Sequence, residues 1–545
     1  MVRGFTADNS IREPQVSIPR VVTQPLSGNP LASAAIEGSA PPGWYEPRPR
    51  DVASWAERLE SVRSDFGNDW MARLAPAFDA TGKAKERLEA SARGRGVVVT
   101  TGQQPGLFGG PVYTLSKALS ALALADSLQE ATGIPVAPVF WAATDDTDFK
   151  EASSTVIAVP GGAQLLRIDH AEQLGRTMAG MPLGDVSAEL EALTHSTGSM
   201  IDSAPIELLQ QFYKPGETIG SAYVSFLRAL FAPLGIAVID ASHKNTREAA
   251  RPVLTRALEK AGEIADRVNA RNRELDAAGF APQVQDVPGL SLVFTSVSGG
   301  RKRVPIKAAA MHATSDDLGP NVLLRPVVER AILPTATYIG GPAEIAYFAQ
   351  VALIADVLKV ARPAIIPRWS CIIIEPHVEK ILEKLQLLPE DFREPHEVEA
   401  RVARAHLPKR VIDELNATRV VLDERLRALS EVVAAEGRAP VGQAVTDGLR
   451  ANLMRRLDRF ERRLISAAKK QHAEIMQEIA TARGSLYPFG KPQERSLNFV
   501  PRLARYGGAL LEPMLEEARA HAKRLAGAKT SSPPLEESVP ARGRS

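Results

Sequence analysis

The sequence predicts an α/β domain joined to a long antiparallel pair of α-helices. Two apolar runs, residues 97–101 and 134–144, have the composition of strands that are buried on both faces of a sheet. A glycine-rich loop and then a helical pattern follow the first run. Beyond about residue 397, apolar residues recur at spacings of three, four and seven with charged residues between them, which indicates coiled-coil helices.

The composition is that of an ordinary globular protein. The chain has 545 residues, of which 44% are hydrophobic and 24% charged, and its 66 basic and 64 acidic residues leave a net charge of +2. This balance gives no support for a nucleic acid or a membrane surface as a partner. The length corresponds to roughly three or four domain-sized units.

The cysteine content and the N-terminus indicate a cytoplasmic location. The single cysteine, Cys371, excludes an intrachain disulfide and a CxxC metal site and fits a reducing compartment. A lone buried cysteine is usually a small apolar core residue, and we expect that role for Cys371. The N-terminal residues contain no apolar segment of the kind found in signal peptides. No apolar run approaches the ~18 residues of a membrane span.

Changes in composition divide the chain into five segments. Residues 1–50 are rich in Pro, Gly and Ser, which indicates an extended N-terminal arm. Residues 51–390 are expected to form the α/β core, with a helical insertion at about 170–234. Residues 391–485 are expected to form the coiled-coil hairpin, and 486–525 to return to the core. Residues 526–545 have the composition of a disordered tail.

The stretch after the first strand is the first candidate binding corner. Residues 102–106 and 109–111 (GQQPG and GGP) lie between the strand and a helix that begins near Val112. Glycines let backbone N–H groups converge, and a helix N-terminus favours negative charge. We expect Gln103, Gln104, Thr114 and Lys117 to face a ligand. The loop matches neither GxGxxG nor GxxxxGK[ST], and the alternative is a βα turn whose glycines serve tight packing.

An acidic turn follows the second buried run. Asp145, Asp146 and Asp148 come directly after residue 144, and ligands of open α/β sheets bind at the carboxyl ends of strands. Three aspartates so close together require solvent, a compensating cation or a raised pKa. The alternative is a helix start, with Asp148 as the cap and Glu151 as its capping-box partner.

A second strand, Gly-Gly-Pro and helix corner lies at residues 333–360, with Gly340, Gly341 and Glu344 at its centre. It resembles the first corner, and we expect the two corners to form two halves of one crevice. A last strand pair is expected at 363–375, with Arg368 in it. Further strands are expected at 155–159, 164–168, 235–240, 282–284 and 291–297.

Two apolar stripes form the predicted hairpin, over residues 411–433 and 449–479, with a turn at 437–442. Each helix has roughly 35–40 residues, or about 55 Å at 1.5 Å per residue. Such an arm cannot bury its outer face alone, so we expect a homodimer through the coiled coil. The alternative is a solvated, charged hairpin without a partner.

Four longer stretches resemble one known family. They are residues 101–119 (TGQQPGLFGGPVYTLSKAL), 138–151 (PVFWAATDDTDFKE), 321–350 (NVLLRPVVERAILPTATYIGGPAEIAYFAQ) and 493–499 (QERSLNF). Weaker matches occur at 43–55, 235–241, 279–284 and 363–370, and all of them run in order from about 43 to 507. The family is that of the bacillithiol biosynthesis cysteine-adding enzymes.

This resemblance implies a Rossmann-like core with connecting insertions and a long helical, antiparallel coiled-coil domain that supports dimers. It also implies addition of L-cysteine to glucosaminyl-malate, which gives bacillithiol, and a core similar to that of class I aminoacyl-tRNA synthetases. One position departs from the family pattern. Thr147 stands where the family usually has a histidine, and threonine does not titrate near neutrality.

The expected activity is that of an ATP-dependent, amide-forming ligase, since joining a carboxylate to an amine in water is uphill. Activation of cysteine is expected through an acyl-adenylate or acyl-phosphate, with Mg²⁺ as a further cofactor. The catalytic residues assigned are Lys117, Asp145, Asp146, Asp148 and Arg325. The nucleotide-binding residues are Gly102, Gln103, Gln104, Gly106, Gly110, Tyr113, Thr114, Gly340 and Gly341. The substrate-binding residues are Glu344, Tyr347, Gln350 and Arg368.

Arg325 is expected to pair with phosphate or a malate carboxylate, and the aspartates with Mg²⁺ or the substrate amine. Two alternatives stay open. The first is an ATP-dependent ligase of the same fold that acts on a different amine, which Thr147 motivates. The second is a non-catalytic scaffold in which the coiled coil binds a partner.

Overall fold

The structure is a computed structural model that describes residues 18–26, 28–67, 69–168, 175–285, 287–297, 300–394, 396–436 and 441–527. The chain forms two compact units. The first comprises Met1–Ile157, Leu165–Ile373 and Glu494–Ser545, and the second comprises Ala158–Gln164 and Ile374–Gln493. Each unit is described by itself.

A five-stranded parallel sheet is the centre of the first unit. Its strands lie in the order β11-β10-β2-β3-β6. They are β2 (Val97–Gln103), β3 (Val136–Ala142), β6 (Ala237–Asp240), β10 (Thr335–Gly340) and β11 (Ile365–Pro367). The chain first builds β2, β3 and β6 in one direction and then returns to the other side of β2 with β10. Ligand crevices of open α/β sheets lie at such a reversal, which here falls between β2 and β10.

The predicted buried strands are confirmed. Every residue of β3 and β10, and all but the last of β2, is buried. Strands that are buried on both faces need helices packed on each side of the sheet. Three helices bury much of this sheet. They are α3 (Trp70–Phe78) and α4 (Gly82–Arg93), which share an apolar cluster with β2, β3 and β6, and α5 (Val112–Thr132), which packs on β2 and β3.

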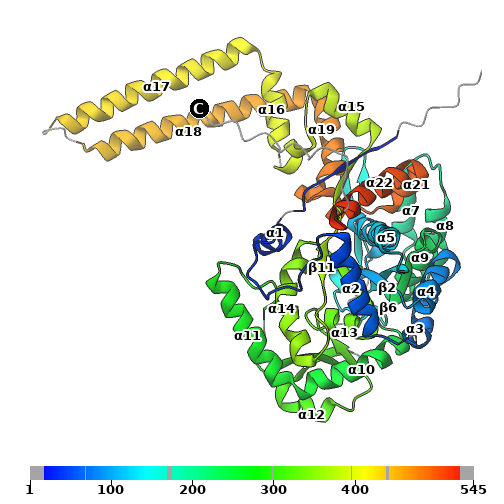
Figure 1. Cartoon of the computed structure of the whole chain (residues 1–545). Helices are drawn as coiled ribbons and strands as arrows, with labels where there is room; N and C mark the ends of the chain where they lie inside the picture. The colour runs from blue at the N-terminus through cyan, green and yellow to red at the C-terminus, as the bar shows by residue number, and fades with distance from the viewer. Residues whose placement is uncertain are drawn as a thin grey trace, which may run out of the picture. The chain divides into compact units, whose positions relative to one another are not determined.

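The other helices of the first unit complete this arrangement. They are α1 (Pro30–Glu37), α2 (Val52–Ser64), α10 (Lys244–Glu259), α11 (Ala261–Ala277), α13 (Arg325–Ile332), α14 (Pro342–Leu358), α20 (Gln493–Ser496), α21 (Val500–Tyr506) and α22 (Gly508–Leu525), with the first residue of α20 in the second unit. Helices α10, α11, α13 and α14 share a second apolar cluster. Helix α22 packs along α5 (Figure 1).

Two insertions interrupt the sheet. The first, between β3 and β6, contains α6 (Phe149–Ala152), β4 (Ser154–Val159), β5 (Gly162–Arg167), α7 (Ser187–Thr197), α8 (Ala204–Phe212) and α9 (Ile219–Phe231). The predicted helical insertion at 170–234 thus contains α7 to α9, and its residues 170–174 lie outside the described part. The second insertion contains α12 (Ala309–His312) and an antiparallel sheet of β8 (Gly300–Pro305), β7 (Leu290–Val297) and β9 (Leu318–Pro320).

Two details of the predicted strands are corrected. Residues 282–284 form no strand, because the N–H and C=O groups of Val284 bond to the side chain of Gln350 instead of to a neighbouring strand. The expected strand pair at 363–375 is two strands, but β12 (Cys371–Ile374) pairs with β1 (Arg20–Thr23) and not with β11. The arm predicted over 1–50 therefore contains a paired strand and a helix, and its residues 1–17 lie outside the described part.

The second unit contains the coiled-coil hairpin. Its helices are α15 (Pro376–Leu385), α16 (Glu397–Ala405), α17 (Lys409–Ala435), α18 (Gln443–Gln471) and α19 (Ala473–Leu486). Helices α17 and α18 run side by side (Figure 1). Ser430 donates to Asp447 near the turn, and Arg419 reaches Glu461 farther away, which is the pairing of antiparallel helices.

The hairpin helices are shorter than expected, because α17 begins at Lys409, after Pro408, and α18 ends at Gln471. Their 27 and 29 residues correspond to about 40 Å each. The second unit begins at Ile374, earlier than the boundary of 390 proposed from composition. Helix α15 belongs to it, since Lys384 of α15 pairs with Glu478 of α19 at 2.7 Å. Residues 528–545 of the predicted tail lie outside the described part.

Among the helices that the described residues form, none combines the length and the apolar character that a membrane crossing requires.

Candidate active site

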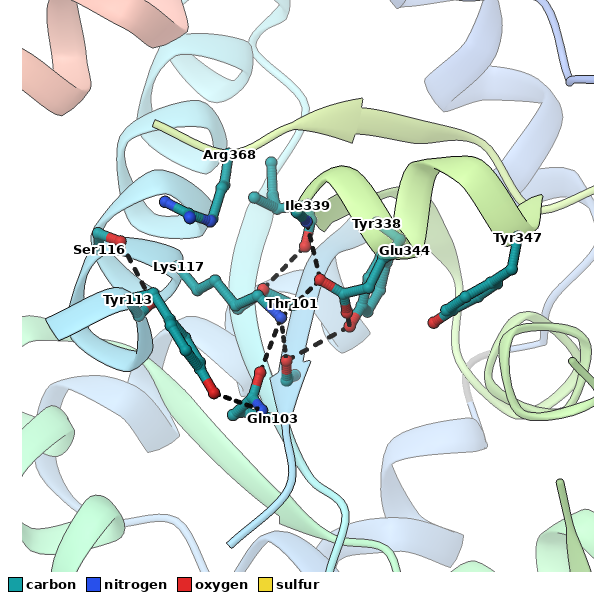
Figure 2. A network of polar contacts seen from close by, with 12 residues as sticks. Thr101, Gln103, Tyr113, Ser116, Lys117, Tyr338, Ile339, Glu344, Tyr347 and Arg368 are labelled. Atoms are coloured by element: carbon teal, nitrogen blue, oxygen red, sulfur yellow. Dashed lines mark hydrogen bonds and ion pairs between the residues drawn. The ribbon is translucent and has the colours of Figure 1, made fainter. Parts of the chain in front are cut away.

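The two Gly-Gly-Pro corners meet at the carboxyl ends of β2 and β10. Lys117, on the helix after the first corner, forms an ion pair with Glu344, on the helix after the second, at 2.6 Å between Nζ and Oε2 (Figure 2). The two corners are therefore adjacent, as the prediction that they form two halves of one crevice requires. The corners lie at the point of the sheet where the strand order reverses, which is where open α/β sheets bind their ligands.

Lys117 is buried, and each of its three N–H groups has an acceptor within the chain. Besides Glu344, the ammonium donates to the carbonyl oxygen of Gly102 at 2.8 Å and to Oε1 of Gln103 at 3.0 Å (Figure 2). Burial lowers the pKa of Lys117, although Glu344 opposes the shift. Lys117 therefore ties the two corners together, and a phosphate could contact it only by replacing one of these partners.

Glu344 caps the helix that carries it. Its Oε2 accepts from the N–H of Gly341 at 2.8 Å, and its Oε1 accepts from the Tyr338 hydroxyl at 2.6 Å. Burial alone would raise the pKa of Glu344, but the Lys117 ammonium and the Gly341 N–H outweigh burial and lower it. The carboxylate stays ionised with 18% of the side chain exposed, so it can still meet a cationic group in the crevice.

The glycines of the first corner are packed inside the protein. Gly109 and Gly110 have φ values of +86° and +84°, and a Cβ on Gly109 would lie 2.6 Å from the ring of Phe226. The N–H of Gly110 donates to Leu107. The side-chain amide of Asn498 donates to the carbonyl oxygens of Leu107 and Phe108. Close packing therefore accounts for this loop as it stands.

Three further N–H groups near the start of α5 are also bonded within the chain. The N–H of Val112 donates to Leu497, that of Thr114 to Pro111, and that of Gly109 to Gly106 and Tyr213. The N–H groups of Gly109, Gly110, Val112 and Thr114 could bind a phosphate only by giving up these partners. Gly106 belongs to the same buried turn, where a Cβ on it would lie 2.8 Å from Gly110.

One polar atom of this corner has no partner. The hydroxyl of Thr114 is fully buried, and among the described residues nothing accepts from it or donates to it. A Cβ on residue 110 would lie 3.1 Å from this hydroxyl oxygen. Because Gly110 has no side chain, the space next to the Thr114 hydroxyl is not filled from that side. A buried hydroxyl without a partner costs free energy, which a polar ligand atom would recover.

The acidic turn after β3 contacts the first corner. Asp146 accepts from the Gln104 side chain at 2.6 Å and from the N–H of Asp148 at 2.8 Å. Asp148 in turn caps α6 by accepting from the N–H of Glu151 at 3.0 Å. The helix-start interpretation thus describes Asp148, whereas the Glu151 carboxylate instead accepts from the Tyr113 hydroxyl at 3.1 Å.

Asp145 has a cationic partner that the sequence did not reveal. Arg301 of β8 donates to the carbonyl oxygen of Asp145 and lies 3.4 Å from its carboxylate. Burial raises the pKa of Asp145, with Arg301 opposing the shift and Asp146 adding to it. Within the described residues no three His, Cys, Asp or Glu side chains are grouped so that they could hold a metal ion.

Arg325 lies on the second side of the crevice. It donates to Glu329 at 2.6 Å and to the Tyr347 hydroxyl at 3.4 Å, and its guanidinium carbon is 4.7 Å from the centre of the Tyr338 ring. Burial raises the pKa of Tyr347 to about 12, so its hydroxyl stays protonated. With 13% of its side chain exposed, Arg325 can reach an anionic ligand.

Two predicted substrate residues have other partners. Arg368 is buried and donates to both carboxylate oxygens of Glu494, at 2.8 and 2.5 Å. Gln350 is fully buried and bonds to Asn272 and Val284, so its amide does not join the other predicted residues.

Sequence reasoning missed Arg301, Tyr338 and the partnership of Glu151 with Tyr113. Arg301 belongs to a separate small sheet, and nothing in its local pattern indicates that it reaches Asp145. Tyr338 could have been found, because it stands two residues before Gly340 at the end of a buried strand.

Comparison with known proteins identifies two matching family models. Residues 42–369 match "Bacillithiol biosynthesis BshC, N-terminal Rossmann-like domain", and residues 371–525 match "Bacillithiol biosynthesis BshC, C-terminal coiled-coil domain". Both parts of the expected fold class, the Rossmann-like core and the coiled coil, are therefore confirmed.

Several curated proteins are similar over most of their length. A protein of Koribacter versatilis is 31% identical over 494 residues, which cover 87% of this chain and 89% of that protein. A protein of Solibacter usitatus is 30% identical, with coverages of 83% and 88%, and one of Chlorobaculum tepidum is 29% identical, with coverages of 80% and 83%. Each carries the name "Putative cysteine ligase BshC".

Proposed function

The chain belongs to the bacillithiol biosynthesis BshC family and is a ligase of that pathway, and from this premise we propose its reaction. It joins the carboxyl group of L-cysteine to the amine of glucosaminyl-malate, which gives bacillithiol. The names of the relatives support cysteine as one substrate, and the family's pathway supports bacillithiol as the product.

The observation that carries the proposal is the meeting of the two corners at the carboxyl ends of β2 and β10. The Lys117–Glu344 ion pair joins the corners, and the partly exposed side chains of Asp146 and Arg325 add charges of both signs nearby. Glu344 offers a carboxylate to the ammonium group of cysteine, and Arg325 offers a guanidinium to a malate carboxylate. Two zwitterionic or polyanionic substrates need such a mixed site.

ATP is the second part of the proposal. Amide formation in water is uphill, so the cysteine carboxyl group must be activated at the expense of a nucleotide phosphate. The position of the crevice at the reversal of strand order fits a nucleotide, and the unpartnered Thr114 hydroxyl fits a phosphate or ribose oxygen beside Gly110. Mg²⁺ usually takes one or two carboxylates together with phosphate oxygens, and Asp145 and Asp146 would supply them.

The test is reconstitution with purified protein. L-cysteine, glucosaminyl-malate, ATP and Mg²⁺ are mixed, bacillithiol is measured by mass spectrometry, and the nucleotide product is identified as ADP or AMP. Product that requires both substrates and ATP supports the proposal. Cleavage of ATP that depends on cysteine but yields no bacillithiol overturns glucosaminyl-malate as the acceptor.

A second candidate function keeps the activation step but changes the amine. It is motivated by Thr147, which takes the place of the histidine that the family usually has in the acidic turn. Amide formation with another amino sugar, at a rate well above that with glucosaminyl-malate, would favour it. Thiol profiles of the organism with and without this gene separate the two functions in the cell.

We also propose that two copies of the chain associate through the hairpin and that the enzyme acts in the cytoplasm. The support for association is the set of large apolar side chains that α17 and α18 leave exposed in one copy. They are Val411, Val420, Val421, Leu429, Val432, Val445, Leu449 and Phe460. The single buried cysteine supports a reducing compartment.

A further inference from the structure

Glu329 holds the guanidinium of Arg325 from the core of the protein. It lies one turn after Arg325 on α13 and is buried, with 2% of the residue exposed. Its Oε2 accepts from Arg325 at 2.6 Å, and its Oε1 accepts from the hydroxyl of Thr100 on β2. The carboxyl group of Glu329 therefore connects Arg325 to the central strand of the sheet.

Two tyrosines contact the same guanidinium (Figure 2). The guanidinium carbon lies 4.7 Å from the centre of the Tyr338 ring, and one Nη donates to the Tyr347 hydroxyl at 3.4 Å. The contacts among the described residues thus use two of the five N–H groups of Arg325. The guanidinium is held in one orientation and keeps N–H groups for a ligand.

The pair of Arg325 and Glu329 does little for the helix that carries it. Arg325 is the first residue of α13, where the positive end of the helix dipole disfavours a cation. A cation that precedes its carboxylate by four residues is also the weaker order of such a pair. Because burying both groups costs free energy as well, the arrangement points to a use for the oriented guanidinium.

We propose that Glu329 is a positioning residue that, together with Thr100, aims the Arg325 guanidinium at the malate carboxylate of the acceptor. This role rests on the proposed function. A planar guanidinium binds a carboxylate through two parallel hydrogen bonds, so its orientation decides how well it binds. Glu329 fixes that orientation, and Arg325 itself makes the contact with the substrate.

The oxygens of Glu329 matter more for this role than its charge. Burial raises the pKa of Glu329, although Arg325 and the Thr100 hydroxyl oppose the shift. A glutamine at this position keeps an oxygen for Arg325 and an amide group for the Thr100 hydroxyl. A leucine of similar size keeps neither, so the two substitutions separate hydrogen bonding from packing.

The test measures KM and kcat of Glu329→Leu and Glu329→Gln for each substrate. In Glu329→Leu the KM for glucosaminyl-malate should rise about tenfold or more, because a charge-assisted hydrogen bond is no longer well aligned. The KM values for L-cysteine and ATP, and kcat, should stay within about twofold. Glu329→Gln should stay within about threefold of the wild type in each constant. Glu89→Leu, which removes a partner of Arg93 on α4, is the matched control and should match the wild type.

An acceptor without the malate group shows whether Glu329 acts through that group. Methyl glucosaminide keeps the sugar amine but offers Arg325 no carboxylate, so wild type and Glu329→Leu should use it with kcat/KM values within about twofold of each other. Arg325→Met should raise the KM for glucosaminyl-malate, and R325M/E329L should add little to that rise, because both substitutions act on one contact. If methyl glucosaminide is not turned over, the double variant decides alone.

The two proposals fail in different ways. Wild-type enzyme that makes no bacillithiol overturns the proposed function, and with it the substrate assigned to Arg325. Active wild-type enzyme with an unchanged KM for glucosaminyl-malate in Glu329→Leu overturns the role of Glu329 alone. An equal loss with methyl glucosaminide, an additive loss in the double variant, or a Glu329→Gln variant as impaired as Glu329→Leu overturns it as well.

Thr100→Val tests the same role if Glu329→Leu does not fold. Valine keeps the shape of threonine but donates no hydrogen bond to Glu329. The KM for glucosaminyl-malate should then rise about threefold, and an unchanged KM overturns the positioning role.

Discussion

Lys117 shows that the contacts of a charged side chain decide its role. Its position one turn into the helix after a glycine loop predicted a phosphate ligand, but its ammonium already has three acceptors in the chain. Arg325, by contrast, has one carboxylate partner and part of its surface free. Of the two cations, Arg325 is therefore better placed to meet an anionic substrate.

Replacing Lys117 by methionine should destabilise the protein. The substitution leaves Glu344 buried without its cation, and removing one member of a buried ion pair costs about 3 kcal/mol of the free energy of unfolding. The free energy is measured by urea denaturation. The double variant K117M/E344Q should recover much of the loss, because it has no unpaired carboxylate and glutamine can still bond to Gly341 or Tyr338. Lys150→Met, an exposed lysine, is the control, and a single variant as stable as this control would contradict the role of Lys117.

Asp145→Asn should raise the melting temperature at neutral pH. Burial raises the pKa of Asp145 in the folded protein, so the folded state binds this proton more tightly than the unfolded state. The protonated carboxyl therefore stabilises the fold at a pH below the pKa that Asp145 has in the unfolded chain. This stabilisation is lost as the pH rises through the higher pKa that Asp145 has in the folded protein. The variant should therefore gain stability over the wild type as the pH is raised from 3 to 7, and lose activity.

Two results would contradict this prediction. One is a difference in melting temperature between variant and wild type that is the same at every pH, and the other is a variant that melts below the wild type at pH 7. Either would mean that Arg301 compensates the ionised carboxylate fully. A gain in stability with a loss of activity is the usual sign of a group that is kept for function.

At the scale of elements, the sequence predicted those whose pattern is local. Strands β2 and β3 begin with or consist of apolar runs, β10 leads directly into a Gly-Gly-Pro turn, and α17 and α18 carry long apolar stripes, so each could be located from its own residues. The pairing of β1 with β12 and the approach of Arg301 to Asp145 depend on partners far along the chain. No local pattern encodes such contacts, and the residues at 282–284 were misassigned for the same reason.

The segment 497–499 holds the first glycine loop in place. Asn498 donates to the carbonyl oxygens of Leu107 and Phe108, and Leu497 accepts from the N–H of Val112. Asn498→Ala should leave two buried carbonyl oxygens without this donor and cost about 1–3 kcal/mol. Hydrogen exchange should then be faster at Gly109, Gly110 and Val112.

The matched control for Asn498 is Asn452→Ala, an exposed asparagine on α18. This control should change the free energy of unfolding by less than about 0.5 kcal/mol. It should leave hydrogen exchange at the glycine loop unchanged. Unchanged exchange at Gly109 and Gly110 in Asn498→Ala would show that the loop keeps its conformation without this segment.

At the scale of the whole molecule, the two units have different kinds of surface. Helices of the first unit bury their apolar residues in shared clusters around the sheet. Helices α17 and α18 pack on each other but bury few side chains fully, and several valines and Phe460 stay about half exposed. Exposed apolar residues concentrated on one hairpin are typical of an interaction surface.

If a second copy covers this surface, charges placed on it should separate the copies. V420E/F460E puts a carboxylate on each helix of the hairpin, where burial against another copy would cost several kcal/mol. Light scattering with size exclusion should give twice the chain mass for the wild type and the single mass for the variant. Met311→Glu, an exposed apolar residue of the first unit, is the control and should stay dimeric. A wild type with the mass of a single chain would show that the apolar side chains of the hairpin stay exposed to solvent. A variant that remains a dimer would show that the copies do not associate through α17 and α18.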